Sequence, residues 1–129
     1  MQMAQASRLN GNWKLLNMTT AGSPMPMLPI ANKVPTVQFS GNRVAGTGGC
    51  NRFMGGFTTS GNTLSIGPLG STMMACEQGV MQQETMFLTA LQGAQTYEIS
   101  SDGILTISYQ NEQGTGVLRF ASEAVRALW

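Results

Sequence analysis

The sequence predicts a mainly β protein: a small antiparallel β-barrel of about eight strands, with one α-helix between the fifth and sixth strands. Short segments in which apolar and polar residues alternate recur along the chain. Turn signals rich in glycine separate these segments, and the triplet Ser-Gly-Asn occurs twice, at 40–42 and 60–62. One stretch has apolar residues at helical spacing instead. Eight antiparallel strands can close into a barrel that is filled by side chains or holds one small ligand.

Five strand segments precede the helix. The segment 36–40 shows the pattern clearly, because Val37 and Phe39 point to one face and polar residues to the other. The prolines of the segment 21–29 exclude a helix interior and a central strand, so we expect a surface loop there. The five predicted strands are 13–18, 36–40, 43–49, 53–59 and 63–66.

The segment 79–92 is the predicted helix. It contains no proline, and Gly93 is the predicted end point. At 100° per residue its apolar residues form one face, made of Val80, Phe87, Leu88 and Leu91.

Three strand segments follow the helix, at 96–100, 104–109 and 117–121, with turns at 101–103 and 111–114. We therefore expect one domain over residues 11–121. Residues 1–10 and 122–129 are predicted tails on either side of it.

The composition excludes several classes of function. The 129 residues include seven Lys and Arg, six Asp and Glu and no histidine, for a net charge of +1. Seven scattered Lys and Arg residues form no basic patch of the kind that binds nucleic acid. Without histidine there is no Ser-His-Asp triad, no Cys-His pair and no histidine metal site. No apolar run approaches the roughly 20 residues that span a bilayer. We expect no metal, no cofactor, no transmembrane segment and a monomer.

The two cysteines and the N-terminus each leave alternatives open. Cys50 and Cys76 can form a disulfide in an oxidising compartment, or remain two buried thiols. The first ten residues have no basic region followed by an apolar one, so they do not form a signal peptide. The protein is then either cytosolic or exported with its signal, or lipid anchor, already removed.

Glu84 is the most informative single position. Helical spacing places this carboxylate within the apolar stripe, between Val80 and Leu88. A buried charge is costly unless it is paired, and Arg52 is the candidate partner. Alternatively Glu84 lies at the edge of the helix and reaches solvent.

Several segments together resemble the META domain, the family of the heat-inducible HslJ-type lipoproteins of bacteria. The most specific parts are GCNRF at 49–53, within the segment GGCNRF at 48–53, and TMMAC at 72–76, within the segment STMMAC at 71–76. The others, from 11 to 107, are GNWKL at 11–15, LSIGPL at 64–69, QETMFLTAL at 83–91, YEIS at 97–100 and GILTI at 103–107.

The resemblance implies a lipocalin-like small barrel with one packed helix. It also implies export to the periplasm or anchoring at the outer membrane, where a Cys50–Cys76 disulfide is favoured because the compartment is oxidising. The family's motif residues have no established catalytic role, and we interpret them as a structural signature. They are Cys50, Asn51, Arg52, Phe53, Met74, Cys76 and Glu84.

These observations favour a non-enzymatic envelope domain that contacts another envelope component, in an interaction or stress-related role. The loop residues Met25, Met27 and Leu28 are the predicted apolar contact patch. The alternative is a carrier of a small hydrophobic ligand, by analogy with lipocalin-like barrels. Its predicted pocket is lined by Trp13, Phe39, Leu105 and Tyr109.

Overall fold

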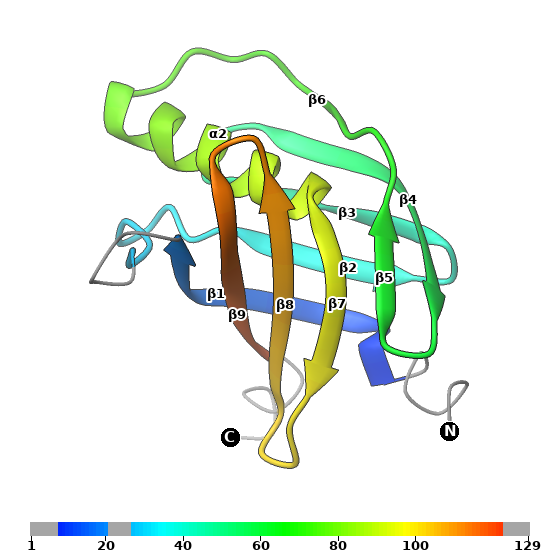
Figure 1. Cartoon of the computed structure of the whole chain (residues 1–129). Coiled ribbons are helices and arrows are strands. Elements are labelled where there is room, and N and C mark those ends of the chain that lie inside the picture. Colours follow the sequence, from blue (N-terminus) through cyan, green and yellow to red (C-terminus); the bar gives the residue numbers. More distant parts are fainter. Residues whose placement is uncertain (1–7, 21–26, 123–129) are drawn as a thin grey trace.

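The computed structural model describes residues 8–20 and 27–122 of the chain (Figure 1). Helix α2 and nine strands lie within these ranges, and residues 8–9 are also helical. The strands before the helix are β1 (Gly11–Thr20), β2 (Thr36–Ser40), β3 (Arg43–Thr47), β4 (Arg52–Ser60), β5 (Thr63–Ile66) and β6 (Gly70–Ser71). The helix is α2 (Gln78–Gln92). The strands after it are β7 (Ala94–Ile99), β8 (Ile104–Asn111) and β9 (Gly114–Ser122).

Eight of these strands form a closed antiparallel barrel. Their order is β3-β2-β1-β9-β8-β7-β5-β4, and β3 pairs with β4 to complete the ring. This confirms the predicted barrel, with the helix between its fifth and sixth strands. The short strand β6 was not predicted. It pairs with β4 alone, through Phe53 opposite Ser71 and Met54 opposite Gly70. Two residues have no periodicity of their own, so only the tertiary contact defines this strand.

Alternation along the strands sends every second side chain into the barrel. Strand β8 shows this most clearly, because Leu105, Ile107 and Tyr109 are buried and the residues between them are more exposed. The strand register extends these positions into rows that cross β8, β9 and β1. One row contains Leu105, Phe120 and Leu15, and the next contains Ile107, Leu118 and Met18.

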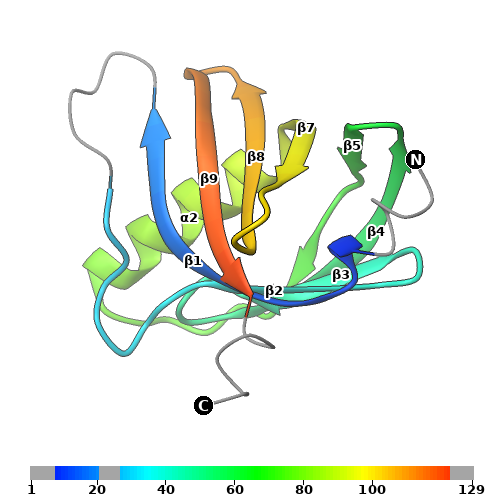
Figure 2. The same ribbon diagram turned by 90° about the horizontal axis from the view of Figure 1, so that it is seen from below.

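Helix α2 lies across one end of the barrel, as the two perpendicular views show (Figures 1 and 2). Its buried residue Phe87 packs between two barrel phenylalanines. The ring centroid of Phe87 lies 6.1 Å from that of Phe53 and 6.2 Å from that of Phe120. Large apolar side chains therefore continue from the barrel interior into the helix, and one core serves both.

Two buried tyrosines differ in how their hydroxyls are satisfied. Tyr109 donates a hydrogen bond of 2.8 Å to the carbonyl oxygen of Thr19 on β1. The Tyr97 hydroxyl has no hydrogen-bond partner within the described part of the chain. Burial raises the pKa of both phenols above the ordinary value of 10.0, because the interior disfavours the phenolate.

Removing one hydroxyl at a time should separate these two environments. We expect Tyr109→Phe to lower the free energy of unfolding by about 1 kcal/mol, because the Thr19 carbonyl loses its donor. Tyr97→Phe should leave stability unchanged or raise it by up to about 1 kcal/mol, because it removes an unpaired buried polar atom. Urea unfolding of both variants measures the difference. Equal losses would contradict the two assigned environments.

Candidate functional site

Three amide or carboxylate side chains are buried in the described part of the chain, and they lie together. They are Asn51, Gln83 and Glu84, each 5% exposed or less. Gln83 and Glu84 are on the first half of α2, and Asn51 ends the connection between β3 and β4. We call these three residues the helix anchor. Buried polar groups are expected to be hydrogen-bonded, and this cluster accounts for its groups by joining segments far apart in the sequence.

The carboxylate of Glu84 accepts hydrogen bonds from the β3–β4 connection. Oε2 accepts from the backbone N–H groups of Cys50, at 3.1 Å, and Asn51, at 2.5 Å. Oε1 accepts from the Asn51 side-chain amide at 2.8 Å. Three N–H donors thus take the place that a counter-ion would fill.

The predicted pair between Arg52 and Glu84 is therefore wrong. Arg52 begins β4 and its residue is exposed. Its neighbours Asn51 and Phe53 are buried, so alternation turns the Arg52 side chain to the outside of the barrel. The alternative, in which Glu84 reaches solvent at the helix edge, is also wrong, because Glu84 is 5% exposed.

Asn51 connects Glu84 to the segment before the helix. Its Oδ1 accepts from the Thr72 hydroxyl at 2.8 Å and from the Met74 N–H at 2.6 Å. Its Nδ2 donates to the Met74 carbonyl at 3.2 Å, as well as to Glu84. The motif residue Met74 takes part through its backbone, and its side chain is 57% exposed.

Gln83 is a member of the anchor that the sequence analysis missed. Its Nε2 donates to the carbonyls of Lys33, at 2.7 Å, and Gly48, at 3.1 Å. Its Oε1 accepts from the Ile30 N–H at 2.8 Å. Helical spacing could have identified it, because Gln83 lies three residues after Val80 and four before Phe87, on the buried face of the helix.

Two glycines allow the β3–β4 connection to approach the helix so closely. A Cβ on Gly48 would lie 2.5 Å from Cγ of Glu84. Gly49 has φ +121°, and a Cβ there would lie 2.7 Å from Nε2 of Gln83. Side chains at either position would push the connection away from the anchor.

A disulfide closes the same region covalently. Cys50 and Cys76 are bonded, with 6.3 Å between their Cα atoms. The bond joins the residue that donates to Glu84 with the residue two positions before α2. It encloses β4, β5 and β6 in one covalent ring.

The other predicted site residues are distributed between core and surface. Trp13, Phe39, Leu105 and Tyr109 are at most 3% exposed and belong to the continuous core, as does Phe53. Of the predicted loop patch, Leu28 is 70% exposed, and Met27 is partly buried and forms a backbone bridge with Met18. Met25 lies outside the described residues.

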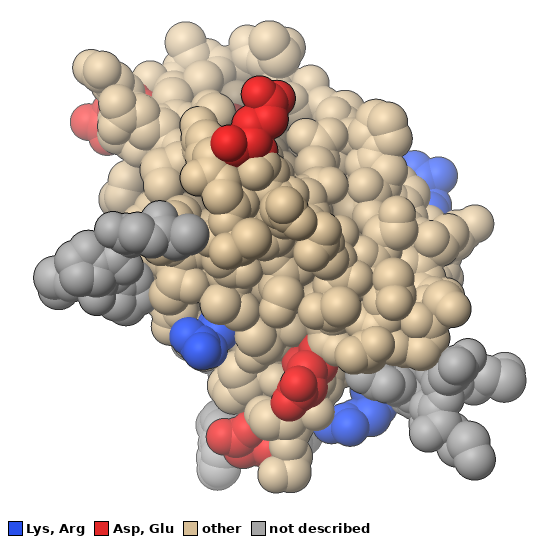
Figure 3. All heavy atoms as spheres, viewed as in Figure 1, with Lys and Arg blue, Asp and Glu red and all other residues tan. Residues whose placement is uncertain are grey.

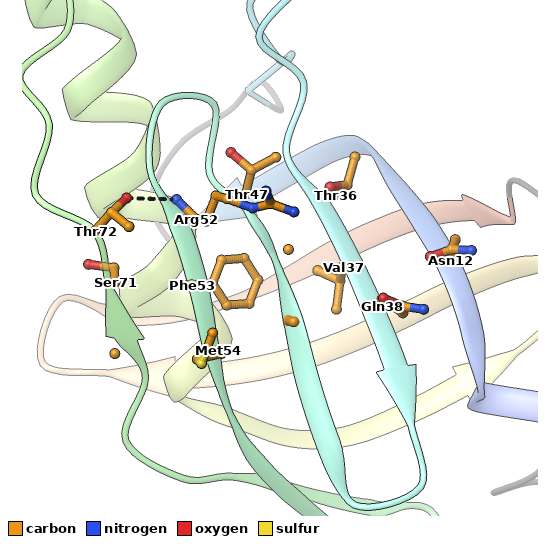
Figure 4. A pocket seen from close by; sticks show the side chains of 13 residues that line it. Asn12, Thr36, Val37, Gln38, Thr47, Arg52, Phe53, Met54, Ser71 and Thr72 are labelled. Carbon is orange, nitrogen blue, oxygen red and sulfur yellow. Dashed lines mark hydrogen bonds between the residues drawn. The ribbon is translucent and has the colours of Figure 1, made fainter.

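The outer face of the barrel has an open groove of about 940 Å³, which the sequence analysis did not predict (Figure 4). The strand register explains its lining. One outward row contains Asn12, Gln38, Ala45, Met54 and Gly70, and a second contains Thr36, Thr47 and Arg52. The lining is completed by Ser71, Thr72, the buried residues Val37 and Phe53, and Gly46, which pairs with both of them in the sheet.

Charged side chains are few on the face of the molecule seen in Figure 3, where they are separated by uncharged surface. Arg52 is the one charged residue among those that line the groove. Figure 4 shows its side chain extending from β4 over β3 towards Thr36 of β2.

The fold and the anchor together define a class of protein: a small antiparallel barrel, filled by side chains and closed at one end by a helix that a buried carboxylate holds in place. The chain belongs to the META domain family, whose match covers residues 6–124. No curated protein matches the sequence. Among described residues, no helix is long and apolar enough to cross a membrane.

Solved structures of similar fold have low sequence identity to the chain. An NMR structure of a protein from Burkholderia xenovorans has a TM-score of 0.70 at 24% identity, over 91% of this chain and 85% of that one. A second NMR structure has a TM-score of 0.62 at 21% identity, over 91% of this chain and 92% of that one. A crystal structure of a DUF4847 family protein from Bacteroides vulgatus has a TM-score of 0.59 at 14% identity, over 88% of this chain and 92% of that one.

Replacing the anchor carboxylate should destabilise the fold. In Glu84→Gln the new amide faces Nδ2 of Asn51, and Asn51 cannot turn over because its Oδ1 already accepts two hydrogen bonds. We expect the free energy of unfolding to fall by about 2–3 kcal/mol in urea unfolding. The control is Glu98→Gln at an exposed position, which should change it by less than about 0.5 kcal/mol. Equal losses of stability in the two variants would refute the role of Glu84 in the helix anchor.

The disulfide should make stability sensitive to reductant. Its loop of 26 residues predicts a loss of about 3–4 kcal/mol on reduction, from the lost constraint on the unfolded chain. Thiol titration of the oxidised protein should find no free thiol without reductant and two with it. The double variant Cys50→Ser/Cys76→Ser should unfold identically with and without reductant. Two free thiols in the oxidised protein would contradict the bond.

Proposed function

We propose that the protein is a non-enzymatic binding module of the bacterial cell envelope, which contacts its partner through the outer face of β1 to β4. The observation that supports this most directly is that large side chains fill the barrel, whereas the groove of about 940 Å³ lies on its outer face. The predicted pocket residues of the carrier alternative are core residues, so nothing in the packing favours that function.

The chemistry of the buried cluster also favours binding over catalysis. Glu84 is 5% exposed, and both its oxygens accept hydrogen bonds from the chain itself. A general acid or base must reach the substrate, directly or through one water. In the described part of the chain, no three Cys, Asp or Glu side chains are grouped so that they could hold a metal ion. The anchor is suited to holding the helix.

Two observations support a location in the cell envelope. The Cys50–Cys76 bond is of the kind that persists in oxidising compartments and is rare in the cytosol. The chain is a META domain, and its motifs resemble those of the heat-inducible lipoproteins. We place the protein in the periplasm or at the outer membrane, in the class of stress-related envelope proteins.

Site-specific photocrosslinking in the source bacterium tests the binding face. A photoreactive p-benzoylphenylalanine is introduced at Gln38, within the groove, and in a matched variant at Ser108, an exposed position on β8. We expect a discrete covalent adduct from the Gln38 variant, in the envelope fraction, and none from the Ser108 variant. Adducts of equal yield from both positions, or none from either, would contradict the proposed binding face. Recovery of the protein in the cytosolic fraction would contradict its proposed location in the cell envelope.

A further inference from the structure

The groove has unused hydrogen-bonding capacity at its floor. Asn12 on β1 and Gln38 on β2 are paired neighbours whose side chains point outwards, and both are exposed. Neither side chain has a hydrogen-bond partner within residues 8–20 and 27–122. Each primary amide offers a carbonyl acceptor and an N–H donor, which is the same complement that a peptide group presents. Two adjacent amides suit a ligand with repeated peptide groups.

The positively charged Arg52 lies at the other side of the same groove. The backbone of Arg52 is held by two hydrogen bonds with Thr72. Its N–H donates to the Thr72 hydroxyl at 3.1 Å, as Figure 4 shows, and its carbonyl accepts from the Thr72 N–H at 3.0 Å. Its guanidinium has no ion-pair partner in the described chain, and no carboxylate lines the groove. Lys14 lies beyond Thr36 in the same cross-strand row, which adds positive charge. A guanidinium binds a carboxylate through two parallel hydrogen bonds.

The remaining lining favours an extended chain over a flat ring. Ala45 and Gly46 add little side-chain bulk to the floor, and Met54, which is 56% exposed, offers an adaptable apolar contact. The one aromatic residue of the lining, Phe53, is 1% exposed and turned into the core, so no ring is available for a nucleobase to stack on. From β1 to β4 the groove crosses three strand spacings, about 14 Å, or about four residues of extended peptide.

We propose that this groove binds an extended peptide segment of about four residues that carries a carboxylate. The carboxylate pairs with Arg52, and the peptide groups bond with the amides of Asn12 and Gln38. This proposal rests on the proposed binding function and specifies its ligand. Of the motif GGCNRF, Cys50, Asn51 and Phe53 are used within the fold, and the Arg52 side chain is the one left to act outwards.

NMR titration of the ¹⁵N-labelled protein with three short peptides tests the proposal. The first is N-acetyl-tetraalanine with a free C-terminal carboxylate. The second is N-acetyl-Ala-Ala-Glu-Ala-amide, and the third is the same peptide with Gln in place of Glu. We expect amide shifts confined to β1 to β4 and residues 70–72 with one or both of the carboxylate peptides, and weaker or no shifts with the neutral one. The peptide that binds identifies the source of the carboxylate.

Matched variants then test the assigned residues. Arg52→Gln should weaken binding of the carboxylate peptide about tenfold, because it removes a charge-assisted bidentate contact. Arg43→Gln changes the same charge at an exposed position outside the groove and should leave affinity within about twofold. Asn12→Ala/Gln38→Ala should weaken all binding peptides, and retained spectral dispersion shows that each variant is folded.

Three results would overturn the proposal: equal binding of the neutral peptide, no loss in Arg52→Gln, or no shifts in the groove with any of the peptides. None of them bears on the photocrosslinks at Gln38. If crosslinks form at Gln38 and the peptides fail, the outer face binds a partner of different chemistry. If the crosslinks fail as well, the proposed function itself is wrong.

Discussion

The carboxylate of Glu84 and the three N–H groups that it accepts from are the interaction on which the rest of the structure depends. A charge removed from water is costly unless hydrogen bonds replace its hydration. Here two backbone N–H groups and one amide do so, and all three come from Cys50 and Asn51. The helix and the β3–β4 connection therefore have to meet at one place and in one orientation. Hydrogen bonds to charged groups are worth more than neutral ones, which makes this contact directional as well as strong.

Asn51 extends that constraint to a third segment. With its amide nitrogen committed to Glu84, its oxygen is left to fix Thr72 and Met74, and Gln83 holds the loop at Ile30 and Lys33 in a similar way. Apolar packing alone is non-directional and would hold the helix over the barrel without defining which loops lie beside it. The polar anchor supplies that definition, and Phe87 supplies the apolar contact beneath it.

The sequence was sufficient to predict the barrel and the helix, because both depend on the periodic spacing of apolar residues along the chain. It was insufficient to predict β6, because these two residues form a strand only through their contact with β4. The partner of Glu84 was missed for a physical reason. A search for a counter-ion considers side chains, whereas the donors here are mostly backbone N–H groups that every residue has. The groove was likewise not visible in advance, since it depends on which outward positions become cross-strand neighbours.

The covalent ring between Cys50 and Cys76 has a consequence for the integrity of the chain. All residues from 70 to 79 are exposed, a run that includes Met73 at 89% exposure, and such extended segments are where proteases cut. A cut between the two cysteines would open the ring and release no fragment, because the bond still joins both halves. The segment can thus be exposed at the surface while a single nick leaves the barrel and its helix in one covalent piece.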